Sequence, residues 1–224
     1  EVNLELAAKL ITERCSDSID SVPLFRGMGT RVQVPYFKAD SSQIQRRSKD
    51  NANYYTELLS KGLKSWKGWP RRDRATICTN DEDVASVYGT TYRVYPENGT
   101  ILAIAPAEDI WNSFSQLIEI VSPDDHFGLD ELMLYIEEMG EEHGAESFAE
   151  SLRLPAMKVF PEATIALSGT VKSILEQYMD PELNGFMRGA VGHIDIPSEP
   201  VEIWFSGRAV FVRDSDLDAL ESLL

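Results

Sequence analysis

Cysteine and histidine are scarce in this sequence, which has two of the former and three of the latter in 224 residues. Cys15 and Cys78 lie far apart without metal-ligand spacing, so the pattern predicts neither a disulfide scaffold nor a zinc motif. His126, His143 and His193 also lack the spacing of metal ligands, and we expect no metal site. Such sparing use of cysteine is typical of a reducing compartment, so we expect a cytoplasmic location.

Long apolar runs are missing as well. The longest run is far shorter than the roughly 20 residues that a membrane-spanning helix needs. Lys and Arg do not cluster beside an apolar helix, as they do in helices that lie on a membrane surface. No signal peptide is visible, and the chain starts at Glu1 instead of Met, which indicates a processed chain or a fragment. We therefore expect no membrane partner.

Positive charge is in short supply. The 37 acidic residues outnumber the 21 basic ones and leave a net charge of −16 at neutral pH, which disfavours non-specific binding to nucleic acid. One stretch runs against this trend: "WPRRDR" (69–74) gathers Arg71, Arg72 and Arg74 beside Trp66 and Trp69. This mixture has two interpretations, a nucleic-acid contact built on stacking and charge, or a surface loop whose arginines offset the acidic remainder.

Repeats, linkers and low-complexity segments are also missing, as are a Gly-rich phosphate loop, a nucleophile elbow and a Ser/His/Asp order. With 43% hydrophobic residues the chain can form an ordinary core. Its mixture of strand-like and helix-like periodicities predicts one α+β domain over residues 1–224, with a mainly helical insertion at about 108–186.

The expected helices cover residues 3–14, 43–62, 80–89, 162–179 and 215–224. Two β-hairpins are expected, one at 91–106 around Pro-Glu-Asn-Gly and one at 200–213 around Ser206-Gly207. Short strands are expected near residues 22–25 and 74–79.

Three stretches carry polar groups where a strand ends. In "SVPLFRGMGT" (21–30), strand formers lead to Arg26 and Gly27. Arginine offers a planar fork of donors for phosphate or carboxylate, and glycine permits close approach of backbone or ligand. The alternative is a strand that ends in a turn beside a surface arginine.

The second stretch is "PVEIWFSG" (200–207), in which Glu202 stands between apolar neighbours on an expected strand. A carboxylate there needs solvent, a partner or a function, because an unpaired buried charge is costly. The third is "ICTND" (77–81), whose Thr79 and Asn80 precede a helix and could cap it or contact a ligand.

The order of these three stretches resembles the arginine–serine/threonine–glutamate class of ADP-ribosyltransferases, including bacteriophage enzymes and bacterial toxin-like effectors. "LFRG", "ICTND" and "PVEIWFSG" carry the resemblance, and "ASVYG" (85–89) sits in the helix that follows the second motif. It covers roughly residues 20–107 and 190–213. It implies a split β core of two small packed sheets with flanking helices, and a location in the host cytosol for a phage or effector member.

The resemblance also implies a substrate and a set of roles. NAD would be cleaved at the nicotinamide glycosidic bond, without a metal, and ADP-ribose transferred to a macromolecular acceptor, which is a protein or, in the alternative, a nucleic acid. Arg26 would hold the NAD diphosphate or adenosine ribose, and the Gly27 backbone would grip the nicotinamide amide. Glu202 would stabilise the oxocarbenium-like transition state. Replacing it by glutamine is then expected to lower the rate about a hundredfold to a thousandfold with little effect on folding.

The remaining roles concern the neighbours of these residues. Thr79 would brace the nicotinamide ribose or Glu202, and Asn80 would lie beside it. Tyr88, or else Tyr92, would stack on the nicotinamide ring.

Two departures from the family pattern leave alternatives open. Arginine-modifying members carry Glu or Gln two residues before the catalytic glutamate, where this chain has Pro200 and, one residue earlier, Glu199. The middle motif reads Cys78-Thr79-Asn80 where Ser-Thr-Ser is commonest. Plain NAD glycohydrolysis therefore stays open. So does a non-catalytic structural or interaction domain, such as a virion component, in which Arg26 and Glu202 are merely paired or exposed.

Overall fold

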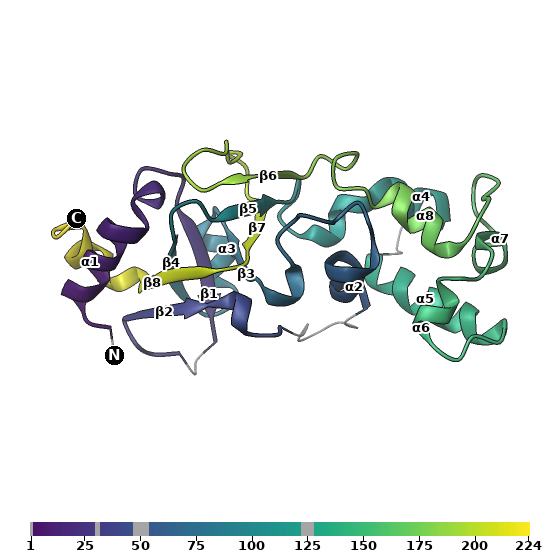
Figure 1. Ribbon diagram of the computed structural model, residues 1–224, viewed down its shortest axis with the longest axis horizontal. Helices are drawn as coiled ribbons and strands as arrows, with labels where there is room; N and C mark the ends of the chain where they lie inside the picture. The colour runs from purple at the N-terminus through teal and green to yellow at the C-terminus, as the bar shows by residue number, and fades with distance from the viewer. Residues whose placement is uncertain (1, 30–31, 47–53, 122–127) are drawn as a thin grey trace. The chain divides into compact units, whose positions relative to one another are not determined.

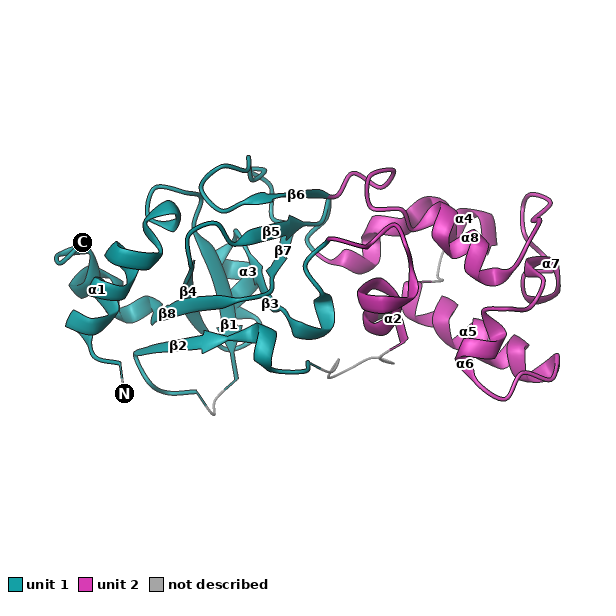
Figure 2. Ribbon diagram, in the orientation of Figure 1, with its two compact units in different colours: residues 1–46, 69–108, 187–224 teal, residues 47–68, 109–186 magenta. Residues whose placement is uncertain are grey.

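The computed structural model describes residues 2–29, 32–46, 54–121 and 128–224. The chain divides into two compact units, coloured separately in Figure 2. Unit 1 consists of residues 1–46, 69–108 and 187–224, and unit 2 of residues 47–68 and 109–186. We had expected one domain with an insertion at about 108–186. Unit 2 contains that insertion together with a second, earlier piece of chain.

Unit 1 contains all the strands that the structure describes and three of its helices (Figure 1). The strands are β1 (Leu24–Met28), β2 (Tyr36–Asp40), β3 (Thr76–Thr79), β4 (Thr90–Pro96), β5 (Ile101–Ile104), β6 (Met187–Ala190), β7 (Glu202–Phe205) and β8 (Arg208–Arg213). The helices are α1 (Leu4–Arg14), α3 (Glu82–Ser86) and α9 (Leu217–Glu221).

The strands form one hydrogen-bonded series in the order β2-β8-β4-β1-β3-β7-β5-β6, in which every pairing is antiparallel. The fold is thus a mixture of helices and strands, as expected, but the described strands form one hydrogen-bonded series and not the two small packed sheets that the resemblance implies. The series is weakest at its middle, because β1 and β3 are paired only through Phe25 and Thr79. Beyond that pair no further ladder pair joins the two strands.

Different segments of the chain pack against the two faces of the sheet. On one face, Tyr95, Val210 and Val212 pack against Ala7, Ala8, Ile11 and Leu220 of helices α1 and α9; we call this the helix face. On the opposite face, which we call the loop face, Leu24, Val94 and Phe211 belong to a buried cluster, against which Val32, Ile194 and Ile196 of irregular segments pack. Helix α1 matches its expected range and is capped by Asn3, whose side chain accepts from Leu6 N–H.

Both expected hairpins are wrong. A turn does form at Pro-Glu-Asn-Gly, with Gly99 at φ 72°, but β4 pairs with β1 and β8 while β5 pairs with β6 and β7. The backbone N–H of Glu97 donates to Arg208 and that of Asn98 to Arg14, so distant segments hold the turn. The turn at Ser206-Gly207 likewise joins β7 and β8, which are not neighbours. In each case longer-range partners replace the adjacent strand.

Unit 2 is helical in the residues that the structure describes. Its helices are α2 (Tyr54–Glu57), α4 (Ser115–Val121), α5 (Leu129–Glu142), α6 (Phe148–Ser151), α7 (Ala156–Val159) and α8 (Val171–Tyr178). The helix expected at 43–62 is represented by α2 and a following π-helical turn at Leu58–Gly62. The helix expected at 162–179 is shorter and begins at α8, where Thr170 caps it.

Candidate functional site

The strand register brings the three motif residues onto three adjacent strands. Thr79 of β3 pairs with Phe25 of β1 on one side and with Glu202 of β7 on the other. Arg26 follows Phe25 directly. Strands in a sheet are about 4.8 Å apart, so Arg26, Thr79 and Glu202 sit within two strand spacings although they are up to 176 positions apart in sequence. Figure 1 shows the three neighbouring strands that carry them.

The three side chains do not all start on the same face. Directly paired residues share a face and consecutive residues alternate, so Thr79 and Glu202 lie on the helix face with Phe25. Arg26 pairs with Tyr92 and begins on the loop face. An ADP-ribosyltransferase site requires these three side chains to line one cleft, and the strand register does not place all three on one face.

Arg26 lies where the hydrogen-bonded pairing of β1 with β3 ends. Its Nη1 donates to the backbone carbonyl of Ile77 at 2.9 Å, and its Nε lies 3.2 Å from the sulfur of Met28. The side chain thus replaces ladder bonds that β1 and β3 no longer make. Its second terminal nitrogen, Nη2, has no hydrogen-bond partner among the residues that the structure describes, which leaves donors for an anion.

Gly27 is needed for the contact with helix α3. A Cβ at this position would lie 2.0 Å from the carbonyl oxygen of Ala85 and 2.7 Å from Cβ of Tyr88. The close approach predicted from the sequence is thus made by backbone of the same chain. Tyr88 itself is 70% exposed just after α3, whereas Tyr92 is buried on β4 with its hydroxyl donating to Val34.

Asn80 is fully engaged in holding the chain before β7. Its amide nitrogen donates to the carbonyls of Pro197 and Glu199, and its carbonyl oxygen accepts from Val201 N–H. It does not cap α3, contrary to one expectation; Asp81 does so by accepting from Val84 N–H. The buried Thr79 accepts from the N–H of Asp81.

Glu202 has a partner that the sequence did not reveal. Arg72 binds both of its carboxylate oxygens: Nη1 contacts Oε1, and Nη2 lies 3.1 Å from Oε2. The side chains are only 5% and 13% exposed, so this is a buried ion pair on a central strand. The guanidinium carbon of Arg72 also lies 5.4 Å from the ring centroid of Trp204, two residues along β7. Alternation on β7, predicted from "VEIWFS", brings Glu202 and Trp204 to the same side.

The basic segment at 69–74 is therefore no exposed stacking platform. Arg71 forms an ion pair with Asp73, and Trp69 is 7% exposed with Arg188 above its ring. Trp66, in unit 2, is 4% exposed and donates from its indole nitrogen to Met179. In the sequence, the only indication of the Arg72–Glu202 pair is that Glu202 stands between apolar residues. This position indicates a cationic partner for the carboxylate but does not identify the residue.

Burial dominates the electrostatics between the motifs. Cys78 stands on β3 beside Thr79, and burial raises the pKa of its thiol from 9.0 to about 12, with Arg26 lowering and Glu202 raising it by smaller amounts. The thiol therefore stays protonated at neutral pH and is no nucleophile.

The described residues contain no group of three or more His, Cys, Asp or Glu that could hold a metal ion. His126, for which we expected no ligand role, lies outside them. Within the same ranges, no helix is long and apolar enough to cross a membrane.

No family model matches this chain, and comparisons with curated proteins and with solved structures found no match either. A functional interpretation therefore depends on the residues and their geometry.

Proposed function

We propose that unit 1 is a mono-ADP-ribosyltransferase, which cleaves NAD at the nicotinamide glycosidic bond. The observation that supports this is the placement of Arg26, Thr79 and Glu202 on three adjacent strands, in the order that the resemblance requires, with Arg26 one residue beyond the paired row of Phe25, Thr79 and Glu202.

In this mechanism the chain's own groups bind NAD and stabilise the transition state. Arg26 binds a phosphate or ribose oxygen of NAD through its Nη2 donors. Glu202 offsets the positive charge that grows on the ribose as nicotinamide leaves. Arg72, bound to both carboxylate oxygens, fixes the orientation of Glu202, and Thr79 lies opposite it. An acceptor nucleophile, or water in the glycohydrolase alternative, then takes the ADP-ribose.

A second candidate is favoured by a specific observation. The bidentate contact with Arg72 already satisfies the Glu202 carboxylate, as in a purely structural ion pair. In that case unit 1 is a non-catalytic structural or interaction domain.

NAD turnover separates the two candidates. We expect the protein, incubated with labelled NAD and a cell lysate, to release nicotinamide and to label a macromolecule. Replacement of Glu202 by aspartate keeps the charge but withdraws it by one methylene, and we expect about a hundredfold to a thousandfold loss of rate. The matched control is Glu199→Gln, which changes an exposed carboxylate three residues away. A wild-type protein without nicotinamide release, or an aspartate variant with full activity, would favour the non-catalytic candidate.

A further inference from the structure

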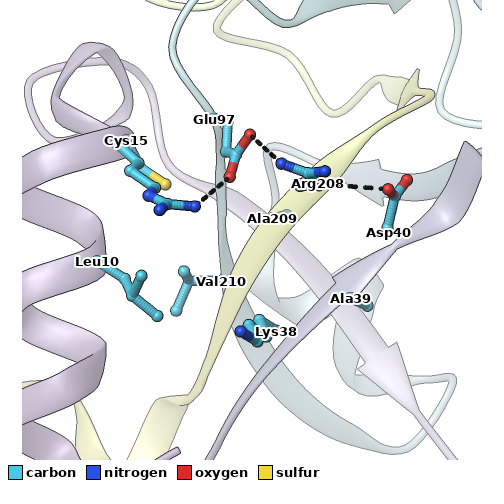
Figure 3. Close-up of a pocket in the computed structure, with 10 residues that line it drawn as sticks. Leu10, Cys15, Lys38, Ala39, Asp40, Glu97, Arg208, Ala209 and Val210 are labelled. Atoms are coloured by element: carbon cyan, nitrogen blue, oxygen red, sulfur yellow. Dashed lines mark ion pairs between the residues drawn. The ribbon is translucent and has the colours of Figure 1, made fainter.

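A cavity of about 370 Å³ opens on the helix face of unit 1, where helix α1 ends (Figure 3). Helix α1 covers the sheet as far as Arg14 and leaves the adjoining parts of β2 and β8 uncovered. In the register of these strands Lys38 lies opposite Val210, and Asp40 opposite Arg208. The cavity volume falls within the range of about 300–1,000 Å³ that small-molecule sites have. Arg26, Thr79 and Glu202 do not line it.

The floor of the cavity is apolar. Leu10 of α1 and Val210 of β8 face each other across it (Figure 3). Ala39 and Ala209 also border it, although their side chains belong to the loop face. Cys15 at the end of α1 is buried, and burial is the main cause that raises the pKa of its thiol from 9.0 to about 12. The thiol is therefore uncharged, and no thiolate borders the cavity.

The rim is charged, and its cations are loosely held. Nη1 of Arg14 lies 3.7 Å from Glu97, while Arg208 lies 3.9 Å from Glu97 and 3.5 Å from Asp40. These distances exceed the roughly 2.7–2.9 Å of a charge-assisted hydrogen bond. Lys38 has no ion pair among the residues that the structure describes. The rim guanidinium groups and the ammonium thus retain donors for an added acceptor.

The charge of the rim selects the ligand. Arg14, Lys38 and Arg208 contribute three positive charges, against two negative charges from Glu97 and Asp40. The hydroxyl of Ser42, with smaller contributions from Ser42 N–H and Arg208, lowers the pKa of Asp40 below its usual value, so Asp40 is charged at neutral pH. One net positive charge above an apolar floor is complementary to a monoanion with an apolar body. It is a poorer match for the nearly double charge of a phosphate monoester.

We propose that this cavity is a binding site for a small organic monocarboxylate, with the carboxylate at Arg14 and Arg208 and the apolar body against Leu10 and Val210. The site is separate from the proposed NAD site, so either proposal can fail without the other.

The test is a titration of the full chain with 3-phenylpropionate, followed by the amide resonances of an NMR spectrum. We expect saturable shifts confined to residues 10–15, 38–40, 97–98 and 208–210. The uncharged amide of the same acid should bind at least about tenfold more weakly, because it lacks the charge-assisted bonds. Phenyl phosphate should also bind more weakly than the carboxylate, and acetate, which lacks the apolar body, should not saturate the shifts at about 10 mM.

Variants distinguish binding in this cavity from non-specific attraction of the carboxylate to any exposed cationic side chain. We expect Arg208→Gln and Arg14→Gln each to weaken 3-phenylpropionate binding about tenfold. Both side chains are more than half exposed, so neither variant is expected to disturb folding. The exposed Arg153 of unit 2 is the matched control, and Arg153→Gln should leave affinity unchanged. Equal affinity for the amide, shifts spread over other surfaces, or no saturation would each overturn the proposal.

Discussion

At the scale of single residues, the central feature is the buried pair of Arg72 and Glu202. From the sequence, Glu202→Gln is expected to leave folding almost unchanged. The structure reverses this expectation, because the variant would leave a buried guanidinium without its opposite charge. Removing one partner of a buried pair costs about 3–5 kcal/mol.

We therefore predict that Glu202→Gln lowers the free energy of unfolding by about 3 kcal/mol. Adding Arg72→Met to the same chain should restore part of the loss, because no isolated charge then remains buried. Chemical denaturation of the two variants and of Glu199→Gln, the exposed control, measures the effect. Loss of stability in the double variant equal to or greater than that in Glu202→Gln would contradict this explanation.

The residue types at the candidate site could be predicted from the sequence, but their partners could not. Arginine, glycine and glutamate at strand ends are visible as local patterns in "LFRG" and "PVEIWFSG". The pairing of Arg72 with Glu202 spans 130 positions and depends on where the 69–74 segment crosses β7. No local periodicity encodes a contact of that kind.

At the scale of elements, helix α3 depends on the missing side chain of Gly27. The carbonyl of Ala85 occupies the place where a Cβ would be, at 2.0 Å, and backbone cannot move aside as a flexible side chain can. A methyl group at Gly27 must therefore push α3 away from β1.

We predict that Gly27→Ala destabilises the protein by about 1–3 kcal/mol, the usual cost of overpacking. Gly29 is the matched control, because a Cβ there would have no atom within 4 Å. Gly29→Ala should leave the thermal midpoint nearly unchanged. Equal midpoints for the two variants would mean that α3 does not require this glycine.

Helices that are specified by nearby residues could be predicted from the sequence, whereas the pairing of strands could not. Helix α1 and the α3 region follow from periodicity and caps, and both were expected close to where they lie. The hairpins at 91–106 and 200–213 failed because a turn signal specifies a reversal of direction only. Which strand lies alongside is decided by burial: β8 buries Val210 against α1 and Phe211 in the core of the loop face, and so enters between β2 and β4.

At the scale of the whole molecule, the two buried thiols link stability to pH. Burial raises the pKa of both Cys15 and Cys78 from 9.0 to about 12. Between these values the folded chain keeps two protons that the unfolded chain loses, so stability falls as the pH rises. The contribution is fully present below about pH 9 and decreases through the window up to about pH 12.

We predict a decline of up to about 1.4 kcal/mol per pH unit for each thiol in that window. Urea denaturation across the lower part of the window measures it for the wild type and for a variant with Cys15→Ala and Cys78→Ala. The variant should show a shallower decline, while tyrosines contribute equally to both proteins. Parallel declines would indicate that the thiols titrate normally in the folded state.

The strand order of unit 1 also has a consequence for folding during synthesis. Strand β7 joins β3 to β5, and β8 joins β4 to β2, yet these two strands come last among the eight. Until both have left the ribosome, the nascent chain can form only the ribbons β3-β1-β4 and β5-β6, with β2 unpaired. Exposed strand edges and long-range closure make such intermediates slow to fold and prone to aggregate. Chaperone demand during translation should accordingly be highest just before residues 202–213 emerge.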